Sequence, residues 1–362
     1  MHLGNVFCAL LSWLSAKSQG GEWVLRIEDL DPQRSREEYA LQLMDDLQWL
    51  GLPWDGEPVW QSQRGHIYEE HLRCLTEMGL TYPCHCTRAD IMATQAPHET
   101  DGRVVYKGTC RPRAIDAINS IDSIGSIDAI DAIDAIGSID STIRTVPATT
   151  RLIVPDRTIP FTDGHYGRHD INLAEHCGDY IVRRKDGAWA YQLAVVVDDA
   201  LMGITEIVRG RDLLLSSPQQ IHHRELLFGE RKTENGTDAG SENRSKIYFD
   251  YAEQQGGKDH EAGLKRKNNS LTAHHSPLTV NFFHHPLLCN AEGQRLCKRD
   301  KSMDLGYLRN KGTTSQEIIG LLAHLAGLTD TPAPITPTEL LPLFSWDKVP
   351  TEDIMLDKQI ML

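Results

Sequence analysis

The chain has 362 residues, of which 40% are hydrophobic and 24% charged, so it can bury a core and form two or three domains. Its formal net charge of -14 argues against a general polyanion-binding protein, and any nucleic-acid contact must come from local basic patches. No run of eighteen apolar residues occurs, which argues against a membrane-spanning helix, and no Lys or Arg precedes the apolar residues 6–16 as in a signal peptide. The eight cysteines are too scattered for a disulfide scaffold, which indicates a reduced, cytoplasmic protein.

The first part of the chain alternates helical and strand patterns. Residues 6–16 form an amphipathic stretch that we expect to be a buried helix, and WVLRIEDLD (23–31) has the pattern of a short strand. Two further helices are predicted at 36–52 and 65–80, where apolar residues recur at helical spacing. This order of elements predicts an α/β domain with a parallel sheet.

The later part of the chain has a second set of elements. Two strand-like runs, AVVV (194–197) and ITEIV (204–208), are separated by a turn, and SSPQQIHHRELLFG (216–229) reads as a helix. Two more apolar segments with helical spacing follow between proline-rich loops. We therefore expect a small helical region at residues 306–362.

Two segments interrupt this pattern. Isoleucine occupies every third position from 115 to 139. Residues three apart on a helix are turned by about 300°, so these side chains define no helical face, and a strand needs a period of two. We predict a weakly structured, low-complexity acidic insertion at 113–147, with a parallel β-solenoid as the alternative. A second, polar insertion is predicted at 230–281.

Two short motifs suggest phosphate binding. His2, Gly4 and Asn5 stand directly before the first helix, whose N-terminus presents free N–H groups and a positive dipole end to an anion. Far along the chain, Gln294–Asp300 (QRLCKRD) contains three cations in five positions, which can neutralise a triphosphate. Taken singly, the first motif is more simply a capping turn and the second a solvated basic loop.

Together and in this order, the two motifs resemble the ATP-binding signatures of class I aminoacyl-tRNA synthetases, HIGH and KMSKS. HLGN stands at the first, and RLCKR at the second, where the glutamyl branch usually has KLSKR. Five blocks between them resemble the glutamyl-tRNA synthetase catalytic domain: LRIEDLDP, WQSQR, GDYIVRRKDGAWAYQLAVVVDD, TEIVRGRDL and PQQ. The resemblance covers about residues 1–112, 148–229 and 282–310, and it implies a Rossmann-like α/β fold.

The resemblance also implies how the chain is divided. Residues 1–80 and 148–229 are similar to the two halves of the catalytic domain, 81–112 to a zinc-binding module, and 282–305 to the region of the KMSKS loop. The two insertions fall between these blocks. About sixty residues remain after RLCKRD, so we expect no anticodon-binding domain in 306–362.

Within this family the chain most resembles the glutamyl-Q tRNA(Asp) synthetases. The implied reaction is ATP-dependent activation of L-glutamate to glutamyl-adenylate, followed by transfer of glutamate to the queuosine base of tRNA(Asp). The implied ligands are glutamate, ATP with Mg²⁺, and tRNA, and we expect a monomer. A fragment of a discriminating glutamyl-tRNA synthetase, or a related binding protein without turnover, remains the alternative.

The resemblance assigns roles to individual residues. Lys298 and His2 match the residues that stabilise the reacting phosphates, and Gly4, Asn5 and Arg299 complete the ATP site. Three residues match the glutamate pocket: Glu28 beside the ammonium group, and Tyr191 and Arg209 for the rest of the amino acid. Arginine suits a carboxylate because it donates two parallel hydrogen bonds. Asp198 and Asp199 are expected to shape the end of the sheet.

The cysteine spacing indicates a metal site. Cys84 and Cys86, separated by one residue, and Cys110 provide three thiolates, and Zn²⁺ commonly takes four tetrahedral ligands. The glutamyl-Q family uses a tyrosine four residues before the last cysteine, which corresponds here to Tyr106. His85 is the rival fourth ligand, and three buried free cysteines are the alternative to a metal site.

One departure from the family pattern concerns the start of the chain. Family members have a strand and turn resembling RFAPSPTG before the HIGH motif, and its arginine and serine contact glutamate. The printed chain begins after that point. A missing central strand leaves backbone groups of its neighbours unpaired, at about 1–3 kcal/mol each when buried. We therefore expect the chain to be less stable and less active than one that carries this segment.

Overall fold

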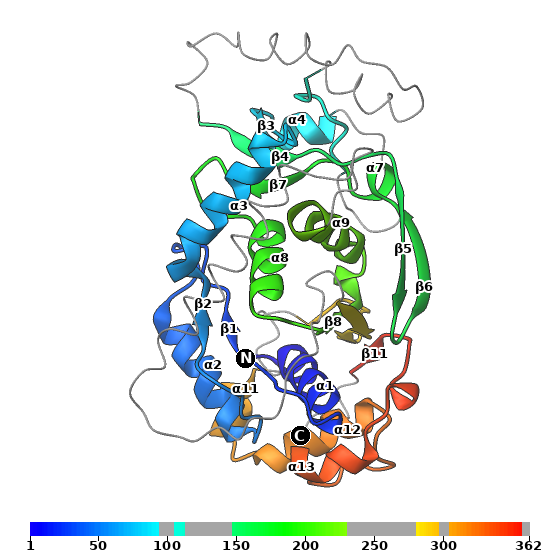
Figure 1. Cartoon of the computed structure of the whole chain (residues 1–362). Helices are drawn as coiled ribbons and strands as arrows, with labels where there is room; N and C mark the ends of the chain where they lie inside the picture. The colour runs from blue at the N-terminus through cyan, green and yellow to red at the C-terminus, as the bar shows by residue number, and fades with distance from the viewer. Residues whose placement is uncertain (94–104, 113–146, 230–279, 297–303, 357–362) are drawn as a thin grey trace, which may run out of the picture.

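The computed structural model describes residues 1–93, 105–112, 147–229, 280–296 and 304–356 (Figure 1). The isoleucine repeat, all but the end of the predicted polar insertion, and the loop with Lys298 and Arg299 lie outside these ranges. The helices are α1 (Leu3–Ser18), α2 (Glu37–Trp49), α3 (Gly65–Glu77), α4 (Arg88–Ala93), α7 (Leu173–His176), α8 (Tyr191–Leu201), α9 (Ser216–Phe228), α11 (Leu305–Asn310), α12 (Ser315–Leu325) and α13 (Pro337–Leu340).

Eleven strands are named over the same ranges: β1 (Arg26–Ile27), β2 (Val59–Trp60), β3 (Thr81–Cys84), β4 (Thr149–Leu152), β5 (Thr158–Asp163), β6 (Gly167–Asn172), β7 (Tyr180–Arg183), β8 (Glu206–Gly210), β9 (Asn281–His285), β10 (Leu288–Cys289) and β11 (Ile354–Met355). The largest sheet has the order β6-β5-β9-β8, in which β9 pairs in parallel with both β5 and β8. β1 and β2 form a further parallel pair. The prediction of an α/β fold with parallel pairing is confirmed.

An antiparallel sheet of order β3-β4-β7 lies apart from this mixed sheet, in which β5 and β6 pair antiparallel, and next to α4 (Figure 1). It carries Cys84 at the end of β3. The sequence does not predict this sheet, because its strands are only four residues long and β4 follows the isoleucine repeat. It matters for function because it positions the cysteine cluster.

Several elements follow the sequence prediction closely. The helices predicted at 36–52, 65–80 and 216–229 are α2, α3 and α9. The predicted strand at 23–31 is much shorter, since only Arg26 and Ile27 pair with a neighbour. In the region 306–362, α11, α12 and α13 confirm the helices, and β11 adds an unexpected strand that pairs with β10.

The strand predicted at AVVV (194–197) is wrong: these residues lie in the middle of α8. All four are buried, and α8 packs against α3, β7 and α9. A helix that is covered on every side needs no polar face. Its apolar run therefore cannot be distinguished by periodicity from that of a buried strand. The strand predicted at 204–208 is confirmed as β8.

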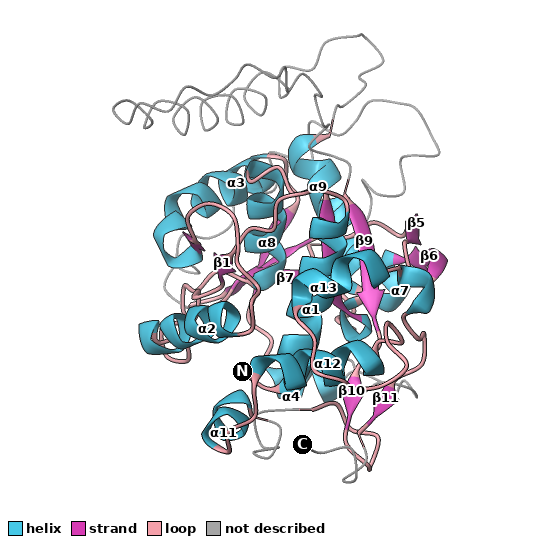
Figure 2. Ribbon diagram, turned by 90° about the horizontal axis from the view of Figure 1, so that it is seen from below, coloured by secondary structure: helices cyan, strands magenta, loops and turns pink. Residues whose placement is uncertain are grey.

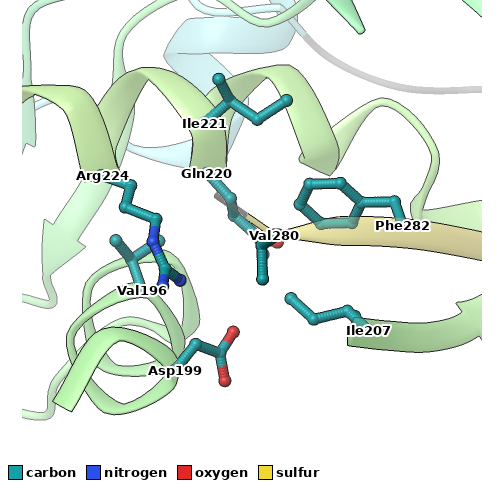
Figure 3. Close-up of a pocket in the computed structure, with 8 residues that line it drawn as sticks. All are labelled: Val196, Asp199, Ile207, Gln220, Ile221, Arg224, Val280 and Phe282. Carbon is teal, nitrogen blue, oxygen red and sulfur yellow. The ribbon is translucent and has the colours of Figure 1, made fainter. Parts of the chain in front are cut away.

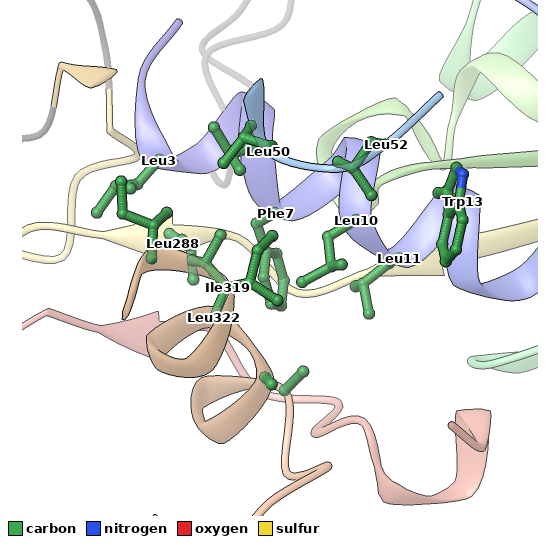
Figure 4. Close-up of a cluster of buried hydrophobic side chains, with 14 of the residues drawn as sticks. Leu3, Phe7, Leu10, Leu11, Trp13, Leu50, Leu52, Leu288, Ile319 and Leu322 are labelled. Carbon is green, nitrogen blue, oxygen red and sulfur yellow. The ribbon is translucent and has the colours of Figure 1, made fainter. Parts of the chain in front are cut away.

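The main hydrophobic core joins the two ends of the described chain. α1 lies beside α12 in both views (Figure 1, Figure 2), and side chains from these helices interdigitate (Figure 4). Burying each leucine or phenylalanine contributes about 1.5–3 kcal/mol. The fully buried members from the two helices include Val6, Phe7, Leu10, Leu11, Leu14, Ile318, Ile319 and Leu322. This confirms that residues 6–16 form a buried helix.

None of the helices in the described ranges combines the length and the apolar character that a membrane crossing needs.

Candidate active site and metal centre

The HLGN turn begins α1. His2 is the residue before the first helical turn, with extended backbone angles, and its N–H donates to the side-chain oxygen of Asn5 at 3.3 Å. A Cβ atom on residue 4 would lie 3.0 Å from Cε1 of His2, so Gly4 lets the imidazole fold over the first turn. The sequence prediction placed these three residues at a helix N-terminus, where the structure has them.

The HLGN turn also meets the chain that follows the second basic motif. Residue 304 forms an isolated bridge with His2, and the N–H of Leu305 donates to the carbonyl of Met1 at 2.7 Å. Within that motif, Leu296 is buried in the same core cluster as Leu3. Lys298 and Arg299 lie outside the described residues; of the described residues that flank them, Leu296 shares the core cluster of Leu3 and Asp304 bridges to His2.

Glu28 follows β1 at a half-exposed position. The guanidinium of Arg26 bridges two acids: it lies 3.2 Å from Oε1 of Glu28 and 2.5 Å from Oδ1 of Asp199 on α8. Arg26 is largely buried, whereas the side chain of Glu28 is 44% exposed. One oxygen of Glu28 therefore faces Arg26, while the carboxylate stays accessible to a ligand.

Asp198 is not at a sheet end, as the sequence suggested, but at the centre of a buried polar network on α8. Its carboxylate accepts hydrogen bonds from Arg64 at 2.6 Å, Gln61 at 2.8 Å and the Tyr68 hydroxyl at 2.7 Å. These donors belong to the WQSQR block and to α3. Asp198 is completely buried, and it ties two blocks together that are far apart in the sequence.

Replacing Asp198 with alanine is expected to lower the free energy of unfolding by about 3–5 kcal/mol, because it leaves the buried Arg64 without its carboxylate. Urea denaturation measures this difference. The matched control is Asp170→Ala, since Asp170 forms an exposed ion pair with Arg168 and its loss should cost below about 1 kcal/mol. An equal effect of both changes would contradict the importance of the network.

Arg209, on β8, is a buried arginine whose hydrogen-bond acceptors are all neutral. Its Nε donates to Nε2 of His284 at 3.1 Å, Nη1 to Oε1 of Gln220 at 2.7 Å, and Nη2 to Oγ of Ser217 at 2.8 Å. Among the described residues no carboxylate oxygen lies within ion-pair distance of this guanidinium. Burial lowers the pKa of Arg209, as expected when desolvation is not offset by a counter-ion.

Tyr191, at the start of α8, is influenced electrostatically by both charged groups of the predicted glutamate pocket. Burial raises the pKa of its hydroxyl, Arg209 lowers it, and Glu28 raises it again. The pKa of the Tyr191 hydroxyl therefore depends on both the positive charge of Arg209 and the negative charge of Glu28. The three residues predicted to bind glutamate are therefore close enough to affect one another electrostatically.

A small cavity adjoins this group of residues (Figure 3). It shares Gln220 and Phe282 with the surroundings of Arg209, whose guanidinium lies 5.1 Å above the Phe282 ring. The residues that line the cavity are Val196, Asp199, Ile207, Gln220, Ile221, Arg224, Val280 and Phe282.

Sequence reasoning missed three of the residues that hold Arg209. Gln220 lies inside the quoted PQQ block and Ser217 just before it, so a signal for both was present. His284 had no distinctive signal, because the short strand β9 (NFFHH) contains three polar residues. None of the three contacts can be inferred from spacing, because β8, α9 and β9 meet only in the folded chain.

The predicted metal ligands lie together. Cys84, Cys86 and Cys110 form a group whose sulfur atoms are all within 4.8 Å of one another. The hydroxyl of Tyr106 lies 3.4 Å from the sulfur of Cys84 and 3.9 Å from that of Cys86. Three thiols and a phenol that converge in this way fit a tetrahedral zinc site. His85 is exposed and does not belong to the group.

Two thiols of this group, Cys86 and Cys110, differ in their pKa values. Burial raises the pKa of Cys86 to about 11, and a hydrogen bond with Cys110 contributes. Burial also acts to raise the pKa of Cys110, but hydrogen bonds from Tyr106 and from the backbone of His85 outweigh it and lower the value to about 7. One thiol is therefore prepared to ionise, as a metal ligand must.

Comparison with known proteins agrees with this geometry. The catalytic-domain family of class I tRNA synthetases (E and Q) matches residues 1–230. A protein named glutamyl-Q tRNA(Asp) synthetase from Symbiobacterium thermophilum is 35% identical over 98% of this chain and 92% of its own length. One of the same name from Nitratidesulfovibrio vulgaris is 33% identical over 100% and 93%.

Solved structures show the same fold. The crystal structure of a glutamate tRNA ligase from Elizabethkingia meningosepticum, in complex with its amino acid, superposes with a TM-score of 0.65 at 22% identity. The match covers 100% of this chain but 65% of that longer chain.

Proposed function

Because the chain belongs to the class I tRNA synthetases for glutamate and glutamine, and among them to the glutamyl-Q tRNA(Asp) synthetases, we propose that it activates L-glutamate with ATP and transfers it to the queuosine base of tRNA(Asp). The observation that carries the proposal is the buried Arg209, whose hydrogen-bond acceptors among the described residues are all neutral. Its positive charge is left for a ligand carboxylate, which is the group that distinguishes glutamate from glutamine.

In the proposed complex Arg209 and Tyr191 bind the side chain of glutamate, and Glu28 binds its ammonium group. The half-exposed Glu28 carboxylate suits this role because it stays open to solvent while Arg26 holds one of its oxygens at 3.2 Å. Both charges affect the pKa of Tyr191: Arg209 lowers it and Glu28 raises it. A zwitterionic amino acid with an acidic side chain complements this arrangement.

ATP is proposed to bind at the start of α1, where His2, Gly4 and Asn5 face the triphosphate. A carboxylate oxygen of glutamate attacks the α-phosphate, the bond to the β-phosphate breaks, and pyrophosphate leaves. Negative charge grows on the phosphates in this step, and Lys298 and Arg299 stabilise it. Mg²⁺ accompanies the triphosphate as its usual counter-ion. Transfer to the tRNA base then breaks the acyl–phosphate bond and releases AMP; we place this reaction in the cytoplasm.

We propose one structural Zn²⁺, held by Cys84, Cys86, Tyr106 and Cys110. The approach of the Tyr106 hydroxyl to Cys84 and Cys86 and the exposure of His85 support tyrosine as the fourth ligand. The metal would tie residues 105–112 to the end of β3, a strand of the antiparallel sheet. Arg111 contributes to the same attachment, since it pairs with the buried Asp179.

Glutamate-dependent ATP–pyrophosphate exchange, measured with the full chain and without tRNA, tests the proposal. We expect exchange with L-glutamate and at least tenfold less with L-glutamine, whose neutral amide cannot pair with the Arg209 charge. Transfer of labelled glutamate to queuosine-containing tRNA(Asp) is expected to follow. Exchange that appears only with tRNA(Glu) would indicate a glutamyl-tRNA synthetase instead, and no exchange under either condition would indicate a binding protein.

A further inference from the structure

Asp163, at the end of β5, and His284, on β9, form a buried pair that the proposed mechanism does not use. Both side chains are completely buried, and Oδ2 of Asp163 lies 2.6 Å from Nδ1 of His284. On the other side of the imidazole, Nε2 lies 3.1 Å from Nε of Arg209. We propose that Asp163 and His284 are positioning residues: Asp163 holds His284 in one tautomer, and that tautomer orients Arg209 for the glutamate side chain. This inference rests on the proposed role of Arg209.

The tautomer follows from the donors and acceptors. A guanidinium has only N–H donors, so Nε2 of His284 must offer its lone pair to Arg209. In a neutral imidazole the other nitrogen then carries the proton, and Nδ1–H donates to Asp163. Burial lowers the pKa of His284, and the nearby positive charge of Arg209 lowers it further, which is consistent with a neutral ring.

Asp163 is itself fixed by backbone groups. Its Oδ1 accepts from the N–H of His165 at 3.0 Å and of Tyr166 at 2.8 Å, in the turn between β5 and β6. The backbone N–H of His284 donates to the same carboxylate at 3.2 Å. Because these donors hold the carboxylate in place, Oδ2 always faces the imidazole. The orientation of the ring is thus set by the main chain of two strands.

The arrangement explains how Arg209 is aimed without being neutralised. Asp163 lies beyond the imidazole and contacts Arg209 only through it, so the guanidinium receives a hydrogen-bond acceptor but no adjacent negative charge. Gln220 and Ser217, both on α9, hold its two other nitrogens. A carboxylate in the position of His284 would orient Arg209 equally well, but it would form an ion pair and compete with the substrate.

Asp163→Asn tests the tautomer directly. The asparagine must keep its carbonyl oxygen at the Oδ1 position, where two backbone N–H groups donate, so its NH₂ group replaces Oδ2. Nδ1 of His284 then becomes an acceptor, and the proton moves to Nε2, where it meets the Nε–H of Arg209. The volume of the side chain is unchanged, so packing stays the same while the hydrogen-bond direction reverses.

The kinetic experiment compares variants in glutamate-dependent ATP–pyrophosphate exchange. We expect D163N and H284F to raise the KM for glutamate about ten- to a hundredfold while the KM for ATP stays within about twofold, since one hydrogen bond to a charged group is lost. H284Q, which returns a carbonyl acceptor, should recover most of this loss. The double variant D163N/H284F should be no worse than H284F, because both changes act through one contact.

His71→Phe is the matched control. His71 is also buried, but within the described part of the chain its hydrogen bond is to the carbonyl of Ile67 on its own helix, outside the site. H71F is expected to leave the ratio of the two KM values unchanged even if it lowers the melting temperature. An unchanged KM for glutamate in H284F, or parallel increases in both KM values in D163N, would overturn the proposal.

A second measurement separates this inference from the proposed function. ¹⁵N NMR of the histidine rings, with the His284 signals assigned by their loss in H284F, reports the tautomer without any substrate. We expect Nδ1–H in the unmodified protein and Nε2–H in D163N. A protein that shows these tautomers but no glutamate-dependent exchange would refute the proposed function alone. Nε2–H in the unmodified protein would refute the tautomer assignment whatever the activity.

Discussion

Arg209→Met is expected to reduce the kcat/KM for glutamate on the order of 30-fold to several-thousand-fold, while the KM for ATP changes little. Truncating one side of a buried, hydrogen-bonded charge pair costs about 2–5 kcal/mol of binding free energy. Each 1.4 kcal/mol corresponds to about a tenfold change in the binding constant. In the proposed complex that pair consists of Arg209 and the glutamate side chain. Arg209→Lys should recover only part of the loss, because an ammonium cannot donate two parallel hydrogen bonds to one carboxylate.

The same Arg209→Met variant is expected to be at least as stable as the unmodified protein. Arg209 is 7% exposed, and in the absence of ligand its charge has no carboxylate partner among the described residues. Desolvation of the guanidinium is therefore not offset, and its replacement by an apolar side chain should leave the melting temperature unchanged or higher. Loss of activity with no loss of stability is the signature of a residue kept for binding.

Arg168→Gln is the control for this experiment. Arg168 forms an exposed pair with Asp170 on β6, so its replacement should change neither the exchange activity nor the melting temperature measurably. If R209M retained the glutamate kinetics of the unmodified protein, another cation would have to bind the substrate carboxylate. If R209M simply unfolded, the guanidinium would be a structural group and its assignment to the pocket would fail.

Removing the metal is expected to have the largest effect on stability. We expect about one zinc per chain by elemental analysis, and Cys110→Ser or prolonged chelation should remove it. Structural zinc sites contribute on the order of 10 kcal/mol to folding in zinc-finger peptides. Here the loss should unfold the module of residues 81–112 first, since, of the module's described residues, only Tyr82, Cys84 and Tyr106 belong to the small buried cluster that packs it against Ile153. Hydrogen exchange confined to this module measures that local opening.

Two variants distinguish the fourth ligand. Tyr106→Phe removes the hydroxyl that lies 3.4 Å from the Cys84 sulfur, and it should weaken zinc affinity more than the roughly 10- to 100-fold caused by losing a supporting contact. His85→Ala should leave affinity unchanged, because His85 is exposed and outside the group of thiols. Full zinc retention in Y106F together with loss in H85A would reverse this assignment.

Zinc affinity should also decrease as the pH is lowered. Cys86 has its pKa raised to about 11, so in the metal-free protein this thiol is protonated throughout the neutral range and must lose its proton to bind. Each proton released on binding makes the metal-free state more favourable in acid. Competition with a zinc-binding dye at pH 6 and pH 8 should therefore show weaker binding at pH 6. An affinity independent of pH would argue against thiolate ligation.

The sequence alone predicted the features that depend on local spacing. Apolar periodicity located α1, α2, α3 and α9, because a helix that covers a core on one side must repeat its apolar residues at helical intervals. The proximity of Cys84, Cys86, Tyr106 and Cys110 was also predicted, since Cys84 and Cys86 are separated by one residue and the family spacing adds Tyr106 and Cys110. The HLGN motif was predicted to stand directly before the first helix, and the structure places its Gly4 and Asn5 inside the first turn of α1.

Only the tertiary structure shows which apolar runs are buried on all sides and which groups surround each buried charge. AVVV became part of α8 rather than a strand because α3, β7 and α9 bury it on every side, and complete burial removes the amphipathic signal. Asp198 and Arg209 look alike in sequence as charged residues near apolar runs. Only the fold shows that Asp198 is neutralised by Arg64 inside the protein, whereas Arg209 receives neutral acceptors from two other elements and keeps its charge. The physical reason is that the electrostatic state of a buried charge depends on the groups that long-range packing places around it, and these groups leave no pattern in the local sequence.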